Sequence, residues 1–171
     1  VAWMMMQRSF KKEITKENIK KEMTKEFIDY YSKNIDKNSR PIKGVVKFLN
    51  WALSKKISMA VCTNKQERLA LDLLKKINLF HYFEYVAGCD SFEFNKPDPR
   101  HLTNVVEIIG GDLKKTIMVG DSEVDANSAN NANLPFVLVE NGYTEKKTNE
   151  IKHDILIKDF DGFDKIIEEY L

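Results

Sequence analysis

Short apolar runs alternate with amphipathic segments from Ile57 onward, and this alternation constrains the fold more than any other feature of the sequence. Apolar, β-branched runs bounded by turn residues predict buried strands, here at residues 57–62, 84–87, 116–119, 136–139 and 155–157. Helices are predicted between and after them, at residues 66–77 and 99–109, from 122 and from 163. Strands and helices in this order are joined by right-handed crossovers, so we expect an α/β fold with a mostly parallel sheet.

The residues before position 40 have a different, purely helical pattern. Apolar residues recur every four positions with lysine and glutamate between them, as in an amphipathic helix. These apolar residues are Ile19, Met23, Phe27 and Tyr31. Helices are therefore predicted at residues 2–12 and 16–34, and Thr15 can cap the second. The pattern breaks at residues 38–41, and a short helix follows whose apolar side carries Val45, Phe48, Leu49 and Ala52.

Composition limits the classes of function. The chain has 171 residues, of which 43% are hydrophobic, which is enough for one domain with its own core. A net charge of +1 predicts neither nucleic acid nor a membrane as a partner, and no apolar run is long enough to cross a bilayer. Two cysteines make no disulfide framework and there is no signal-peptide pattern, so we expect a reducing cytoplasm.

One predicted strand runs into Gly120 and is followed directly by Asp121. Ser122 can cap the next helix, and Asp125 lies four residues after Asp121, so both carboxylates can face one crevice. The carboxyl ends of parallel strands are where ligands bind, and two carboxylates there suit Mg²⁺. The alternative is an acidic first turn that complements the helix dipole, and this stretch alone does not separate the two interpretations.

Polar residues also follow the two preceding strands. Thr63 and Asn64 come directly after the first strand, where a hydroxyl and backbone N–H groups can hold a phosphate oxygen. Lys96 follows the second strand and a loop, and its charge can neutralise phosphate and a nearby carboxylate. Taken singly, a plain turn and a surface lysine explain them better. Their shared position with Asp121 at one sheet edge favours a phosphate site.

Five stretches of this sequence match a known family in the right order. They are Ser-Arg-Pro at 39–41, Ala-Val-Cys-Thr-Asn-Lys at 60–65, Lys-Pro-Asp-Pro-Arg at 96–100, Gly-Asp-Ser-Glu-Val-Asp at 120–125 and Asn-Gly-Tyr at 141–143. The sequence thereby resembles the haloacid dehalogenase superfamily, and most of all its phosphoglycolate phosphatase branch. The resemblance implies a three-layer Rossmannoid core at residues 41–171 and part of a helical cap at residues 1–40.

The resemblance also implies a role for each site residue. Thr63 would bind the substrate phosphate, with Asn64 beside it, and Lys96 would steady the nucleophile and the phosphoryl group. Asp121 would ligate Mg²⁺, and Asp125 would support the metal site from the second position. Three residues match no catalytic role of the family and are interpreted as structural: Cys62, His81 and His101.

The first motif of the family, which is N-terminal, is absent ahead of the first core strand of this sequence. That motif is a strand ending in Asp-x-Asp, whose first Asp is the nucleophile and whose second is the general acid. Asp29 and Asp36 are the only aspartates before the first core strand, and neither follows an apolar run. We therefore expect that several dozen residues precede Val1 in the intact protein, and that the central strand of the sheet is missing here.

A missing central strand would leave its two neighbours with unpaired backbone. Three outcomes are expected: the neighbours pair directly, a partner chain or second copy supplies a strand, or residues 1–6 fill the gap, the last being least favoured. Two hypotheses of function follow. One is a Mg²⁺-dependent phosphatase of small phosphorylated metabolites such as 2-phosphoglycolate, inactive or nearly so in this form. The other is a catalytically silent relative that binds a phosphate ligand or a protein.

Overall fold

The computed structural model describes residues 16–35, 37, 39–140, 142, 144 and 146–169. Its strands are β1 (Ala60–Cys62), β2 (Tyr85–Ala87), β3 (Met118–Gly120), β4 (Phe136–Val139) and β5 (Ile155–Ile157). Its helices are α2 (Lys16–Asn34), α3 (Val45–Ser54), α4 (Glu67–Lys76), α5 (Pro99–Ile108), α6 (Glu123–Asn131) and α7 (Phe163–Glu168). Short 3₁₀ helices lie in the connections, namely η2 (Phe80–Tyr82), η3 (Leu113–Lys115) and η4 (Thr148–Glu150).

The helices and strands predicted from residue 16 onward are all present, whereas the helix predicted at 2–12 lies outside the described residues. The strand boundaries differ most: β1 begins at Ala60 rather than Ile57, and β3 at Met118 rather than Thr116. A strand begins where its partner begins, and Ala60 is opposite Tyr85, the first residue of β2. Apolar character alone could not place that start.

Local signals fix the ends of α5. The Asp98 carboxylate accepts a hydrogen bond from the backbone N–H of Arg100 at 2.9 Å, and Pro99 occupies the first turn, where its missing N–H costs nothing. At the other end Gly110 has φ +67°, a backbone conformation that glycine adopts without a steric penalty. The helix that follows Lys96 is therefore bounded by its own sequence.

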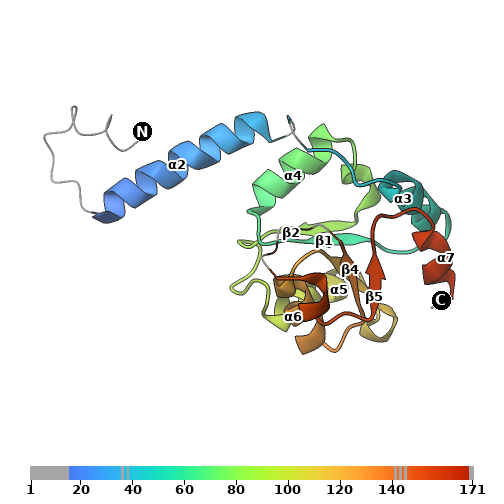
Figure 1. Cartoon of the computed structure of the whole chain (residues 1–171). Coiled ribbons are helices and arrows are strands. Elements are labelled where there is room, and N and C mark those ends of the chain that lie inside the picture. Colours follow the sequence, from blue (N-terminus) through green and yellow to red (C-terminus); the bar gives the residue numbers. More distant parts are fainter. Residues whose placement is uncertain are drawn as a thin grey trace, which may run out of the picture.

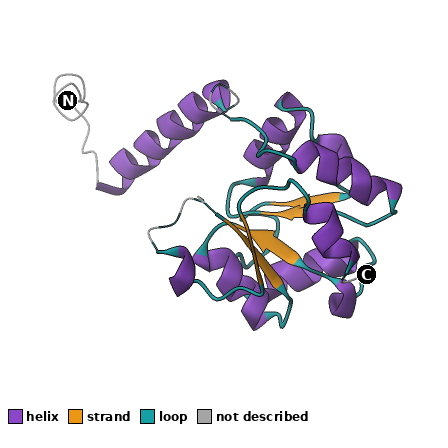
Figure 2. Ribbon diagram, turned by 45° about the vertical axis from the view of Figure 1, so that its right-hand side comes forward, coloured by secondary structure: helices purple, strands orange, loops and turns teal. Residues whose placement is uncertain are grey.

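Every strand pairing in the described residues is parallel, as predicted, but the strands form two sheets. β1 pairs with β2, and β4 lies between β3 and β5 (Figure 2). No described strand pairs with the outer edge of β1 or of β3, and Cys62 of β1 and Met118 of β3 pack against the same core cluster. All residues of β1 and β3 are only half-buried, whereas all of β4 are buried.

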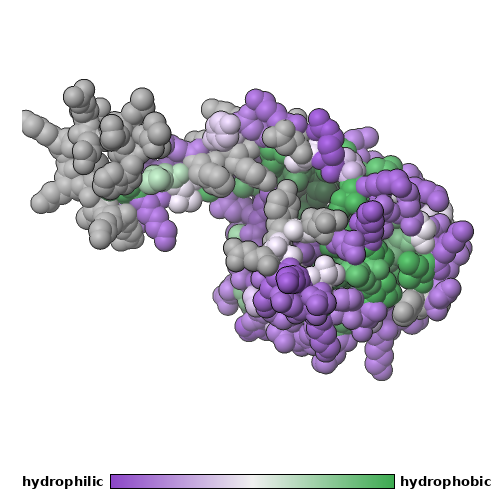
Figure 3. All heavy atoms as spheres, viewed as in Figure 1, coloured by the Kyte–Doolittle hydropathy of each residue, from purple (hydrophilic) through white to green (hydrophobic). Residues whose placement is uncertain are grey.

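The expectation that the neighbours of the missing strand pair directly is therefore wrong for β1 and β3. Residues 1–6, the least favoured filler of the gap, lie outside the described residues, and a strand from a partner chain stays a prediction. In Figure 3 apolar side chains are exposed in the middle of the α/β body, and polar side chains surround them.

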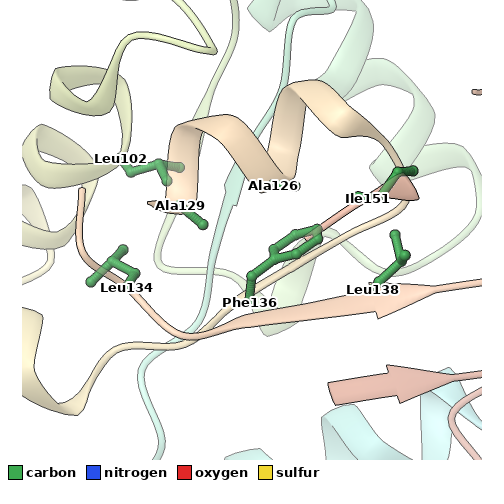
Figure 4. Packing of buried hydrophobic residues seen from close by; sticks show 7 residues of the cluster. All are labelled: Leu102, Ala126, Ala129, Leu134, Phe136, Leu138 and Ile151. Carbon is green, nitrogen blue, oxygen red and sulfur yellow. The ribbon is translucent and has the colours of Figure 1, made fainter. Parts of the chain in front are cut away.

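The core lies on both faces of β4. Phe136 and Leu138 point to a cluster with α5 and α6, which Figure 4 shows, while Val137 and Val139 point to a second cluster with α3 and α7. A strand with alternate residues buried on opposite faces requires helices on both sides. This arrangement confirms the predicted three-layer architecture.

The helix α2 extends from the α/β body (Figure 1). It carries exposed apolar side chains, with Met23 49% and Tyr30 71% exposed, and Ile35 just after it is buried. The assignment of residues 1–40 to a cap stays a prediction. Among the described residues no helix has the length and apolar character needed to cross a membrane, and the cytoplasmic location also stays a prediction.

Ser128 in α6 provides a test of the packing on this helix. Its side chain is fully buried, and its hydroxyl oxygen has no hydrogen-bond partner. An unpaired buried hydroxyl costs roughly 1–3 kcal/mol. We expect Ser128→Ala to leave the free energy of unfolding unchanged or to raise it by about 1 kcal/mol, as measured by urea denaturation. A loss of more than about 1 kcal/mol would mean that the hydroxyl has a partner in solution.

Candidate active site

Lys96 and Asp125 form a buried ion pair at the carboxyl edge of the strands. The ammonium nitrogen of Lys96 lies 2.6 Å from Oδ1 of Asp125, and each side chain is only 8% exposed. Lys96 comes from the loop before α5, and Asp125 from the first turn of α6. Because two charges are buried only when each compensates the other, the pair fixes these two segments against each other.

The second oxygen of Asp125 organises the turn between β3 and α6. Oδ2 accepts hydrogen bonds from the backbone N–H groups of Asp121 and Ser122, at 3.1 and 3.2 Å, and from the Ser122 hydroxyl at 2.7 Å. The Ser122 hydroxyl in turn accepts from the N–H of Asp125, which completes a capping box. A side chain on Gly120 would have no room, since its Cβ would lie 2.5 Å from that of Asp125.

These contacts determine the charge of Asp125. Burial acts to raise the pKa of its carboxyl, but the charge and hydrogen bond of Lys96, with the bonds from Ser122 and Asp121, outweigh burial and lower the pKa. Asp125 is therefore ionised at neutral pH. Its contacts with Lys96 and the turn suit the supporting role that the resemblance implies.

Asp121 follows β3 directly, as predicted, and is half-buried. The loop after β4 returns to it: a Cβ on Gly142 would lie 2.2 Å from the carbonyl oxygen of Asp121. In the same loop the Thr144 hydroxyl donates a hydrogen bond to Glu123, which is the largest cause of the lowered pKa of that carboxyl. Sequence patterns gave no signal for this contact beyond the Asn-Gly-Tyr stretch of the resemblance.

The oxygen ligands at this edge are suited to Mg²⁺. The ion usually takes one or two protein carboxylates and leaves its other positions to water and substrate phosphate. Asp121 supplies one such carboxylate, whereas both oxygens of Asp125 already accept hydrogen bonds from Lys96 and from the turn before α6. Within the described ranges no group of three or more His, Cys, Asp or Glu side chains could hold a metal. The assignment of Mg²⁺ to Asp121, with Asp125 in support, stays a prediction.

Thr63 and Asn64 occupy the turn after β1. The N–H of Thr63 extends the β1–β2 ladder by bonding to the carbonyl of Ala87 at 2.9 Å, and its hydroxyl accepts from the N–H of Lys65 at 3.1 Å. The Asn64 side-chain amide donates to the carbonyl oxygen of Lys96 at 2.8 Å. The structure thus brings the predicted Thr63 turn to the Lys96 loop and gives Asn64 a contact that the sequence did not predict.

A family model of haloacid dehalogenase-like hydrolases matches residues 4–139. The chain belongs to this family. The resemblance inferred from the sequence motifs is confirmed, and with it the Rossmannoid fold class.

Curated relatives and a solved structure agree with this haloacid dehalogenase-like assignment. A phosphoglycolate phosphatase of Mesorhizobium japonicum is 39% identical over 147 residues, which are 86% of this chain and 65% of the relative. Another, from Agrobacterium fabrum, is 42% identical over 134 residues, which are 78% of this chain and 58% of the relative. The crystal structure of a predicted phosphoglycolate phosphatase from Haemophilus somnus matches with a TM-score of 0.84 at 27% identity, over 91% of this chain and 69% of that one.

The chain spans less than two thirds of the length of these two curated relatives. Within that span the structure brings together Asn64 with Lys96, Lys96 with Asp125, and Asp125 with the backbone of Asp121. Four of the five predicted site residues of this haloacid dehalogenase-like chain are therefore linked in one hydrogen-bonded series, and the fifth, Thr63, is next to Asn64 in the sequence.

Proposed function

We propose that this chain carries most of the core of a Mg²⁺-dependent phosphatase, which hydrolyses small phosphorylated metabolites of the 2-phosphoglycolate kind. The observation that carries the proposal is the buried Lys96–Asp125 pair at the carboxyl edge of parallel strands, beside the Thr63 turn. Such a fixed positive charge at a ligand-binding edge suits a phosphoryl group. The names of the curated relatives support the same substrate class.

Each residue has a distinct part in the proposed reaction. Thr63 donates its hydroxyl hydrogen to a phosphate oxygen, and Lys96 neutralises phosphate charge while Asp125 holds its ammonium in place. Asp121 and, in support, Asp125 would hold Mg²⁺, which supplies further positive charge to the phosphoryl group when it is bound. The positions of Lys96 and Asp125 are set before substrate arrives, so little reorganisation is needed during the reaction.

The nucleophile is proposed to come from outside this sequence. No Asp-x-Asp precedes the first core strand of this sequence, and the one at Asp159–Asp161 follows the last strand, where Asp161 pairs with Lys43. The phosphoryl group needs a carboxylate acceptor if one difficult step is to be divided into two. We expect this chain alone to have little or no activity. No described strand pairs with the outer edge of β1 or of β3, which favours, as a second candidate, a binding module that takes a strand from a partner or from a second copy.

Phosphate release tests the proposal. This chain, and the same chain extended at its N-terminus by an apolar strand ending in Asp-x-Asp, are assayed with a generic phosphate ester and with 2-phosphoglycolate, with and without Mg²⁺. We expect turnover only from the extended chain with Mg²⁺, and a fall of roughly 10²–10³ in kcat for Lys96→Met in that chain. His153→Gln, whose ring bonds locally to the carbonyl of Ile151, is the control and should keep full activity.

The other outcomes of this assay have definite meanings. Metal-dependent turnover by the chain as it stands, abolished by Asp121→Asn, would show that another carboxylate is the nucleophile. An inactive but folded extended chain would contradict the phosphatase proposal and favour the binding module. The mass of the present chain in solution, measured by light scattering, distinguishes a monomer from copies joined through β1 and β3.

A further inference from the structure

His101 is a buried side chain that the proposed chemistry does not use directly. It lies in the first turns of α5, five residues after Lys96, and its side chain is 0% exposed. Its ring contacts two other segments: Nε2 lies 3.0 Å from the carbonyl oxygen of Gly88, after β2, and Nδ1 lies 3.2 Å from Sγ of Cys62, the last residue of β1. The ring of Phe92 covers it edge-on, with ring centroids 5.6 Å apart.

The partners of the ring determine where its proton lies. A carbonyl oxygen only accepts hydrogen bonds, so Nε2 must carry the hydrogen that is donated to Gly88. In the neutral ring Nδ1 then has no hydrogen and can accept one from the Cys62 thiol at 3.2 Å, the nearer of two acceptors, since the carbonyl oxygen of His101 lies 3.5 Å from the same sulfur.

Burial favours this neutral pair. It is the largest cause of the lowered pKa of His101, and it raises the pKa of the Cys62 thiol to about 11. The charge of Lys96 acts to lower the pKa of the Cys62 thiol and that of Asp125 to raise it. The charge of Lys96 also acts to lower the pKa of His101, and that of Asp98 to raise it.

The contacts of His101 fasten the loop that carries Lys96. Within this loop the Asn64 side chain donates to the carbonyl of Lys96, and five residues later, in the first turns of α5, the His101 ring contacts Cys62. Asn64 and Cys62 flank Thr63 in the sequence. The turn that bears the hydroxyl and the loop that bears the ammonium are thus joined by a bond on each side of Thr63.

We propose that His101 is a positioning residue, which acts with Cys62 to hold Lys96 at a fixed position relative to Thr63. The effect on catalysis rests on the proposed phosphatase function, whereas the effect on Lys96 does not. Cys62 and His101 thereby gain a functional task beyond the structural role that sequence reasoning gave them. A misplacement of about 1 Å in such a group costs up to roughly 10²-fold in rate. Loss of the contact between His101 and Cys62 would therefore lower the rate although neither residue contacts the substrate.

The first test measures the bond and needs no enzyme activity. Nitrogen-15 NMR of the His101 ring in the present chain reports which nitrogen carries hydrogen. We expect hydrogen on Nε2 and none on Nδ1 at neutral pH, and a shift of the Nδ1 resonance in Cys62→Ala. A ring protonated on Nδ1, or on both nitrogens, would overturn the proposal whatever the variants do.

The second test measures Lys96 itself. The NMR signal of the buried Lys96 ammonium is compared in the wild-type chain, Cys62→Ala, Cys62→Ser and His101→Gln. Cys62→Ser keeps a hydrogen-bond donor, and His101→Gln keeps an amide donor for Gly88 but puts a rotatable amide oxygen in place of the rigid ring nitrogen that faces the thiol. We expect the ammonium signal to shift or broaden in Cys62→Ala and His101→Gln and to recover in Cys62→Ser. Cys89→Ala, which removes the other thiol, is the matched control and should leave it unchanged.

The extended, active chain provides the third readout. We expect Cys62→Ala to lower kcat by roughly tenfold to a hundredfold with little change in KM, and Cys62→Ser to restore most of the rate. Unchanged kcat and an unchanged ammonium signal, with only a lower melting temperature, would show that His101 is merely structural. If no extended chain turns over, the phosphatase proposal fails, and the Lys96 signal still decides whether His101 positions that side chain.

Discussion

Asp125→Asn is expected to destabilise the protein by about 3–5 kcal/mol, the usual cost of removing one partner from a buried ion pair. The Lys96 ammonium is only 8% exposed and lies 2.6 Å from the carboxylate that the change neutralises. The asparagine oxygen can still accept hydrogen bonds from the Ser122 turn, so the loss of stability measures mainly the cost of burying the unpaired charge of Lys96. Urea denaturation followed by circular dichroism measures the free energy of unfolding.

A second change separates the charge from the packing. Lys96→Met in the Asp125→Asn background removes the orphaned charge, so we expect the double variant to be more stable than Asp125→Asn alone. Glu168→Ala breaks the exposed pair with Lys55 and serves as the control, with little measurable change. A cost below about 1 kcal/mol for Asp125→Asn would contradict burial of the pair, because that is the range of surface pairs.

Phe136→Ala is expected to cost about 3–5 kcal/mol, since truncation of a buried aromatic side chain loses both its transfer free energy and the contacts around the cavity. Phe136 is 1% exposed and lies in the cluster between β4 and the pair α5 and α6. These helices carry the residues of the candidate site near their first turns. Thermal and urea unfolding both measure the effect.

Leu156→Ala on the neighbouring strand β5 is the matched control for Phe136. The Leu156 side chain is 42% exposed, so it has less apolar contact to lose and should cost well under half as much. Equal losses at the two positions would contradict the three-layer arrangement, in which β4 is covered on both faces and β5 is not fully covered. The comparison therefore tests the architecture as well as one side chain.

Most of the fold could be predicted from local sequence patterns. The alternation after Ile57 determined the α/β class, and the Asp98-Pro99 and Ser122-to-Asp125 signals located the starts of α5 and α6. These features depend on residues within about one helical turn of each other, which a sequence displays directly. The motifs of the haloacid dehalogenase-like family predict Thr63, Lys96 and Asp121 as site residues, and each motif is likewise a short stretch that the sequence displays directly.

The sequence alone could not predict contacts between distant residues. Asn64 and Lys96 are 32 positions apart, and Cys62 and His101 are 39 apart, so neither hydrogen bond has a local pattern. The sequence predicts Asn64 beside the phosphate and a structural role for Cys62 and His101. The packing of α5 against the ends of β1 and β2 determines all three positions.

Local sequence patterns were enough to find the order of the elements and the capping of the helices α5 and α6, and they predict the residues that would bind phosphate and Mg²⁺. Three features became known only from the folded structure. The strands form two sheets, with no pairing between β1 and β3. Lys96 and Asp125 form a buried ion pair, and a contact between Cys62 and His101 joins the start of α5 to the Thr63 turn. The difference lies in the distance along the chain over which each interaction acts. Propensity and capping act within a few residues, whereas strand pairing, burial of charge and long-range hydrogen bonds depend on which surfaces meet when the chain folds.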